Sequence, residues 1–159
     1  MSDPAATWRP MAQADLPGVE RIGEAVHADF PERPDIFAER LALFAEGCWV
    51  TAGGYAVAHP IRLGAPPALD TLLGALAADA DTLHVHDVAL LPALQGRGLG
   101  RAALGLLRGV AARHGLARMS LVAVHGSGPY WARFGFADAP AAEGLASYGA
   151  DARYMVAKT

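Results

Sequence analysis

Apolar side chains recur along the chain with two different periods, and these periods predict the order of its helices and strands. A helix is expected within residues 12–30, where apolar positions return every three or four residues at Leu16, Val19, Ile22 and Val26. Asp15 is the expected cap of this helix. A second helix is expected over 35–47, with Asp35 as its cap and Gly47 as its stop. Its apolar stripe comprises Phe37, Leu41 and Phe44.

Runs of apolar and β-branched residues predict the strands. A short strand is expected over 7–11, and residues 48–61 read as two strands joined in a tight hairpin at Gly53-Gly54. Further strands are expected at 83–91, 117–124 and 152–159. Further helices are expected at 100–114 and, as a short one, at 126–135. The stretch 64–82 is expected to be a loop with one helical turn.

The resulting order, β-α-α-β-β-β-α-β-α-β, is typical of one mixed α/β sheet. No repeat, linker or block of charge divides the 159 residues, so the whole chain, 1–159, is expected to be a single domain. A hydrophobic fraction of 53% supports a packed core rather than a disordered chain.

Charge and cysteine content narrow the setting in which the protein works. A formal net charge of −3 argues against nucleic acid as the main partner, because phosphate backbones recruit strongly basic surfaces. The single cysteine, Cys48, is interpreted as a buried small hydrophobe, and the lack of any intrachain disulfide suits a reducing compartment. No apolar run approaches the roughly 20 residues of a membrane span, and the start shows no secretory signal. We therefore expect a cytoplasmic protein that does not associate with membranes.

The turn from Gln95 to Arg101 combines bare backbone with positive charge. It carries glycine at three alternate positions and two arginines, at the point where the helix over 100–114 should begin. A helix start leaves backbone N–H groups unpaired, and glycine lets a ligand approach them, so the turn is typical of a phosphate cradle. A turn that merely packs the helix against the sheet would explain the glycines but not Arg97 and Arg101.

Two other kinds of phosphate site fit the turn less well. No Gly-Lys-Ser/Thr sequence occurs, so the Walker pattern is absent. A dinucleotide fingerprint matches only loosely, at Gly98, Gly100 and Ala103, and His125 stands where an acidic residue is expected after the next strand.

The six residues Gln95 to Gly100 match the Q/R-x-x-G-x-G/A signature of the GCN5-related N-acetyltransferases, and the chain resembles this family over nearly its whole length. "DVALLP" at 87–92 is similar to the strand that precedes the cradle in the family. "PYWARFGF" at 129–136 is similar to its aromatic-x-x-x-Gly-Phe helix. The resemblance implies a mixed, mostly antiparallel sheet flanked by helices, with splayed central strands.

The resemblance also implies acetyl-CoA as co-substrate and no metal. Backbone N–H groups would hold its diphosphate at Gln95, Gly96, Arg97, Gly98, Leu99, Gly100 and Arg101. The pantetheine arm would lie between the strand that ends at Leu90 and the strand over 117–124, pairing with backbone near Val88 and Leu90. His125 falls where the family often has asparagine and could touch the same arm.

In this family the acceptor amine attacks the thioester directly, which calls for a base and benefits from an acid. His84 and His86 are the expected base candidates because histidine titrates near about 6.5. His59 is a third candidate. The family's tyrosine acid falls at position 131, where this chain has Trp131; the neighbouring Tyr130 either replaces it or packs the channel.

The acceptor should bind beside the connection between the first two helices. His27, Asp29, Phe30 and Glu32 lie there and suit a cationic amine, although a solvated loop would have the same composition. We expect a small-molecule amine as acceptor and leave a homodimer open. A catalytically silent acyl-CoA-binding module is the alternative function, and a nucleotide-binding protein is a third.

Overall fold

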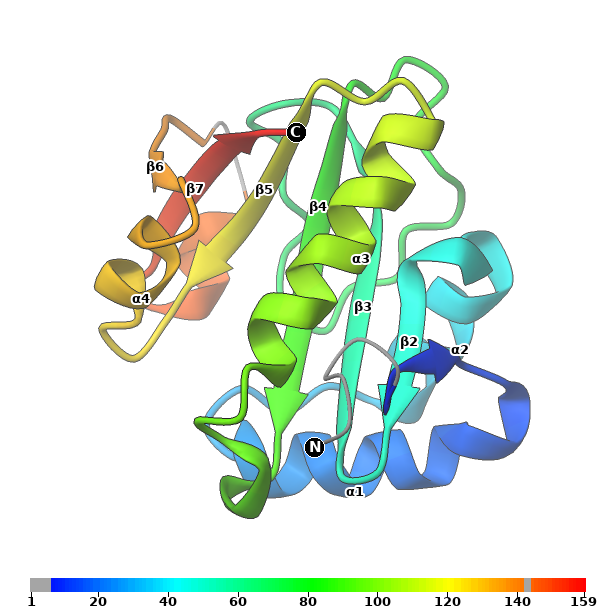
Figure 1. The fold of residues 1–159 in the computed structure, drawn as a ribbon. Coiled ribbons are helices and arrows are strands. Elements are labelled where there is room, and N and C mark those ends of the chain that lie inside the picture. Colours follow the sequence, from blue (N-terminus) through cyan, green and yellow to red (C-terminus); the bar gives the residue numbers. More distant parts are fainter. Residues whose placement is uncertain (1–6, 142–143) are drawn as a thin grey trace.

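The computed structural model describes residues 7–141 and 144–159 and shows one sheet with the strand order β1-β2-β3-β4-β5-β7-β6 (Figure 1). The first six residues, part of the start in which no secretory signal was found, lie outside the described chain. The strands are β1 (Arg9–Pro10), β2 (Cys48–Thr51), β3 (Gly54–Ile61), β4 (Thr82–Leu90), β5 (Arg118–Ala123), β6 (Ala137–Asp138) and β7 (Arg153–Lys158). All neighbours pair antiparallel except β4 and β5, so the expected mixed, mostly antiparallel sheet is confirmed.

Helices cover both faces of the sheet (Figure 1). They are α1 (Leu16–Val26), α2 (Pro34–Leu43), α3 (Leu99–Arg113) and α4 (Gly128–Ala132), with 3-10 turns η2 (Gln13–Asp15), η3 (Ala45–Gly47), η4 (Pro92–Leu94) and η5 (Leu145–Tyr148). Alternate residues of β3 face opposite sides, as in any strand. Ala56 and Ala58 pack with the buried side of α3, whereas Tyr55 and Val57 pack with α1 and α2. None of the helices in the described residues has the length and apolar character needed to cross a bilayer.

Three local expectations need correction. Asp35 is not the cap of α2: Arg33 is, and Pro34 opens the helix because its fixed φ suits the first turn. The hairpin turn consists of Ala52 and Gly53, since Gly54 already pairs with Thr51 as the first residue of β3. The stretch 64–81 contains no helical turn, and the short strand β6 was not expected.

β4 contains one extra residue, and this irregularity shapes the molecule around it. Val57 of β3 pairs with Asp87, but its neighbour Ala58 pairs with Val85, so His86 is the extra residue of a β-bulge. Pairing between β4 and β5 ends at the same place, with Val85 opposite Leu121. Beyond it the two strands separate, which confirms the expected splayed centre of the sheet.

The bulge also changes which way β4 side chains face. Before it, Leu83 and Val85 belong to the core under α3. After it, Ala89 belongs to the core under α1 and α2, and Asp87 contacts Tyr55 of that core. His86 and Asp87 therefore both lie on the α1–α2 side, next to the opening between the strands.

Candidate active site

A cradle of free backbone amides forms at the start of α3. Gly98 caps the helix with φ 78° and Gly96 has φ 77°, both in the left-handed region that glycine adopts without strain. Among the backbone hydrogen bonds of the described residues, none uses the amides from Gly96 to Arg101. The amide of Gln95 is engaged with Pro92, so the row of free donors begins one residue later than expected. This geometry can accept an anion such as a phosphate.

The side chains around the cradle line a cavity of about 430 Å³. Seven of the ten residues expected to bind the cofactor line this cavity: Val88, Leu90, Gln95, Gly96, Gly98, Gly100 and Arg101. Gln95 braces the loop through its side-chain amide, which donates to the carbonyl of Leu90. Arg97 is exposed and does not line the cavity. Leu99 is buried in the core, so it could take part only through its backbone.

An arginine that the sequence analysis missed completes the positive charge. Arg133 lines the cradle cavity together with Arg101. The Arg101 guanidinium lies 5.6 Å from the ring centroid of Phe134, and that of Arg133 lies 5.9 Å from those of Tyr130 and Phe134. Such contacts orient arginine. The signal available in the sequence is the basic residue inside "PYWARFGF".

Tyr130 and Trp131 occupy different places. Tyr130 lines the cradle cavity, and its hydroxyl lies over Gly100, where an added Cβ would come within 2.7 Å of it. Trp131 lines both the cradle cavity and the cavity next to it, and its indole N–H donates to Ser127 Oγ at 3.2 Å. The structure thus places the tyrosine hydroxyl at the cradle and the indole where the two cavities adjoin.

The opening between β4 and β5 forms a second cavity, of about 290 Å³. It shares Val26, Val88 and Trp131 with the cradle cavity, so the two adjoin. His125 lines it with a half-exposed side chain, at the φ of 55° that is uncommon for a residue with a Cβ. The ring of Phe30 meets that of His125 edge-on at 4.9 Å.

The two histidines expected on β4 have different surroundings. His86 lines the opening between the strands, and its Nε2 lies 2.7 Å from Glu32 Oε1. His84 lines none of the cavities described here; it is fully buried, and its Nδ1 lies 2.9 Å from Ser120 Oγ. Burial, with smaller effects of His86 and Arg40, lowers the pKa of His84 to about 3.

His59, the third base candidate, is buried beside both histidines. Its ring centroid lies 5.7 Å from that of His84 and 6.1 Å from that of His86. Burial is the main reason that the pKa of His59 is well below its usual value, with His84, His86 and Arg40 adding to the effect. His59 lines none of the three cavities around the site.

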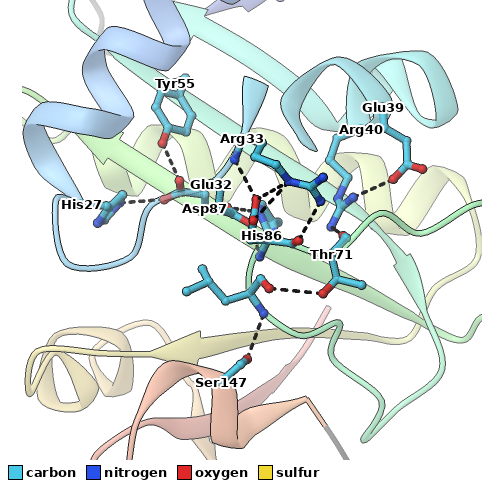
Figure 2. A network of polar contacts seen from close by, with 12 residues as sticks. His27, Glu32, Arg33, Glu39, Arg40, Tyr55, Thr71, His86, Asp87 and Ser147 are labelled. Carbon is cyan, nitrogen blue, oxygen red and sulfur yellow. Dashed lines mark hydrogen bonds and ion pairs between the residues drawn. The ribbon is translucent and has the colours of Figure 1, made fainter. Parts of the chain in front are cut away.

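A second histidine–carboxylate pair adjoins the first (Figure 2). Asp87 Oδ1 lies 2.7 Å from His27 Nε2, and the buried hydroxyl of Tyr55 donates to Asp87 Oδ2. Burial acts most strongly on the pKa of His27 and lowers it, but the carboxylates of Asp87 and Glu32 outweigh burial and raise it. Burial, followed by Asp87, raises the pKa of Tyr55 well above its usual value. Tyr55 was not identified from the sequence, because an apolar strand position gives no sign of a carboxylate partner.

A third cavity, of about 230 Å³, lies on the α1–α2 side and is lined by acids. It shares His27, Phe30, Glu32 and Asp87 with the opening between the strands. Glu20 and Glu24 also line it. Of the four residues expected to meet the acceptor, only Asp29 stays outside both cavities, with an exposed carboxylate 4.0 Å from His125. Within the described residues, no group of three or more metal-ligating side chains is placed to hold a metal ion.

Comparisons with known proteins agree with this fold. Ard1 from Thermoplasma volcanium superposes with a TM-score of 0.74 at 13% identity, over 96% of this chain and 97% of that one. GphF, a GNAT-like decarboxylase in complex with isobutyryl-CoA, gives 0.76 at 14% identity, over 95% and 98%. The ribosomal-protein-S18-alanine N-acetyltransferase from Escherichia coli gives 0.65 at 21%, over 96% and 92%. A search among curated proteins found no match.

The superpositions show the fold alone, and a family model shows the family. The model described as "Acetyltransferase (GNAT) family" matches residues 19–136, a span that runs from α1 through the cradle to the Gly135-Phe136 end of the aromatic helix. The chain belongs to the GNAT family of acetyltransferases.

Proposed function

We propose that the protein is an acyl-CoA-dependent N-acetyltransferase that transfers the acetyl group of acetyl-CoA directly to a primary amine of a small acceptor. The observation that carries this proposal is the row of free amides from Gly96 to Arg101, which adjoins the opening between β4 and β5. Phosphate oxygens suit the amides, and the opening suits a long, narrow arm.

The proposal gives each end of the cofactor its own residues. The amides at Gly96 to Arg101 and the guanidinium of Arg101 would hold the diphosphate, with Arg97 close by. The pantetheine arm would pass Val88 and Leu90, with His125 on the opposite wall of the opening. Tyr130, expected as the acid, has its hydroxyl over Gly100, so we assign it to the phosphate end.

The chemistry needs a base more than an acid. An ammonium has no lone pair, so a base must take its proton before nitrogen attacks the acetyl carbon. Of the two histidines expected on β4, His86 lines the opening and His84 does not, so the proposal assigns the base to His86. When the C–S bond breaks, the electron pair leaves on the sulfur of CoA. A thiol with an ordinary pKa of about 8.5 can depart as thiolate without a tyrosine acid.

The acceptor would enter from the α1–α2 side. The carboxylates of Glu20, Glu24, Glu32 and Asp87 line the cavity there, which suits a positively charged amine. A cytoplasmic location, proposed from the single cysteine, belongs to the same proposal.

Replacing one cradle glycine tests the proposal. Gly98→Asp adds a Cβ and a carboxylate at a left-handed position beside the phosphates, so the dissociation constant of acetyl-CoA should rise at least tenfold, or about 1.4 kcal/mol. Gly105→Asp is the matched control, because it puts the same side chain on the exposed face of α3, where no side chain and no other part of the fold lies within 4 Å of the new Cβ. Calorimetry with acetyl-CoA measures both; unchanged affinity in Gly98→Asp would refute the cradle.

A silent acyl-CoA-binding module remains the second candidate, because Trp131 stands where the family has tyrosine and its N–H is engaged with Ser127. Thiol release from acetyl-CoA with a panel of amines separates the two. Turnover with any amine supports the enzyme, and tight binding without turnover supports the module. Thermal stabilisation by NAD or ATP but not by CoA would favour a nucleotide-binding protein instead.

A further inference from the structure

The residue of β4 that breaks the regular pairing is the one proposed as base. His86 is the extra residue of the bulge, so neither neighbouring strand fixes it by a regular ladder. Its ring is instead held by Glu32, which comes from the connection between α1 and α2. The side chains of His86 and Glu32 are only 1% and 7% exposed, so water does not compete for the 2.7 Å contact between them.

The chemistry of this contact decides which nitrogen of His86 can act. A neutral imidazole carries one N–H and one lone pair, and an ionised carboxylate can only accept. In a neutral His86 ring, Nε2–H would therefore donate to Glu32 Oε1, and the lone pair would be on Nδ1. Within the described residues, His86 Nδ1 is buried and has no hydrogen-bond partner. It is the one ring nitrogen of His86 that no group of the described residues engages.

Glu32 is itself held through its second carboxylate oxygen. Its Oε2 accepts the backbone N–H of Asp70 at 3.0 Å, and Asp70 in turn accepts from the backbone and the guanidinium of Arg33. Asp70 has φ 56°, a costly conformation for a residue with a Cβ, so the surrounding contacts hold it there.

The same segment is joined to α2 a few residues further on. The backbone N–H groups of Leu73 and Gly74 donate to Glu39, and the carbonyl of Thr71 accepts from the buried Arg40. The segment 64–81, between β3 and β4, thus lies along α2 and holds the carboxylate of Glu32 in place.

From this arrangement we propose that Glu32 is a positioning residue, which fixes the tautomer of His86 so that Nδ1 is the base. In the reaction, the acceptor ammonium gives its proton to Nδ1 and keeps the electron pair with which it attacks. The Glu32 carboxylate then faces the imidazolium that forms. This assignment rests on the proposed function for its role in turnover, but the tautomer itself is a property of the protein alone.

Long-range ¹H–¹⁵N spectra of protein labelled at histidine nitrogen, recorded at pH 7.5, test the tautomer directly. His86→Gln identifies the His86 signals by their loss. The wild type should show a neutral His86 protonated at Nε2. A neutral ring protonated at Nδ1, or an imidazolium at this pH, would overturn the assignment, and this measurement needs no variant of Glu32 to fold.

The variant Glu32→Gln provides the second part of the test. An amide can donate as well as accept, so signals of the Nδ1–H form should appear. With the amine that turns over fastest, kcat should fall on the order of 10²-fold while KM for acetyl-CoA stays within twofold. Asp35→Asn removes an exposed carboxylate three residues away, at the start of α2, and should change neither the spectra nor kcat.

The two hypotheses fail in different ways. Unchanged spectra and unchanged kcat in Glu32→Gln would overturn the role of Glu32 and leave the acetyltransferase intact. A tautomer that depends on Glu32, in a protein that acetylates no amine, would support the nitrogen assignment and overturn the proposed function alone.

Discussion

The burial of His84 predicts a specific loss of stability in mild acid. Its folded pKa is about 3, against 6.5 for the free group, because the ring is fully buried beside His86 and Arg40. Between these two values the unfolded chain binds a proton that the folded chain does not, so the free energy of unfolding falls as pH falls. At about 1.4 kcal/mol per pH unit, His84 should lower stability by about 2 kcal/mol between pH 7.5 and pH 5.

Urea unfolding of the wild type and of His84→Gln at several pH values between 7.5 and 5 measures this contribution. The variant has no proton to bind, so its stability should fall by about 2 kcal/mol less over this range, whatever its stability at pH 7.5. Ser120→Ala is the matched control: it removes the hydrogen bond of His84 but keeps the ring buried, so the pH dependence should stay that of the wild type. Parallel curves for the wild type and His84→Gln would refute the reasoning from burial.

Two further predictions concern packing and reactivity. Gly47→Ala would place a Cβ 2.0 Å from the carbonyl oxygen of Ala58 and should lower the free energy of unfolding by about 1–3 kcal/mol, measured with urea. Gly105→Ala has open space around its new Cβ and should raise the free energy of unfolding by up to about 1 kcal/mol. Equal effects of the two variants would contradict the packing around Gly47. Cys48 is fully buried, and burial raises the pKa of its thiol to about 12, so a disulfide reagent should label it only in denatured protein; rapid labelling of the native protein would contradict this placement.

The period of apolar residues was enough to predict the order of the main elements, because burial on one face sets that period in both helices and strands. The motif from Gln95 to Gly100 was enough to predict the cradle, because the free amides of the cradle lie on consecutive residues of one short segment. β6 was missed because it is two residues long and leaves no period to detect. The cap of α2 was misplaced because a carboxylate at Asp35 was preferred over Pro34, whose fixed φ starts the helix one residue earlier.

The rest of the site could not be predicted because its contacts join residues far apart in the chain. His86 and Glu32 are 54 positions apart, and Tyr55 and Asp87 are 32 apart. Tyr55 and Asp87 meet because β3 and β4 pair in one particular register, whereas Glu32 reaches His86 from the connection between α1 and α2. A bulge, moreover, has no signature in a run such as "HVHDV". The sequence could therefore name His86 as a candidate base, but it could not provide the carboxylate that determines which nitrogen is basic.

One inserted residue in β4 accounts for the position of the opening between β4 and β5 and for that of the histidine–carboxylate pairs. Without the bulge, the alternation that turns Val85 toward α3 would also turn Asp87 there, away from Tyr55 and His27. The pairing of β4 with β5 ends at Val85 and Leu121, so the opening begins where His86 is inserted. The place where the strands separate and the place where the histidine–carboxylate pairs gather are thus set by one irregularity, which keeps the proposed base beside the proposed path of the thioester.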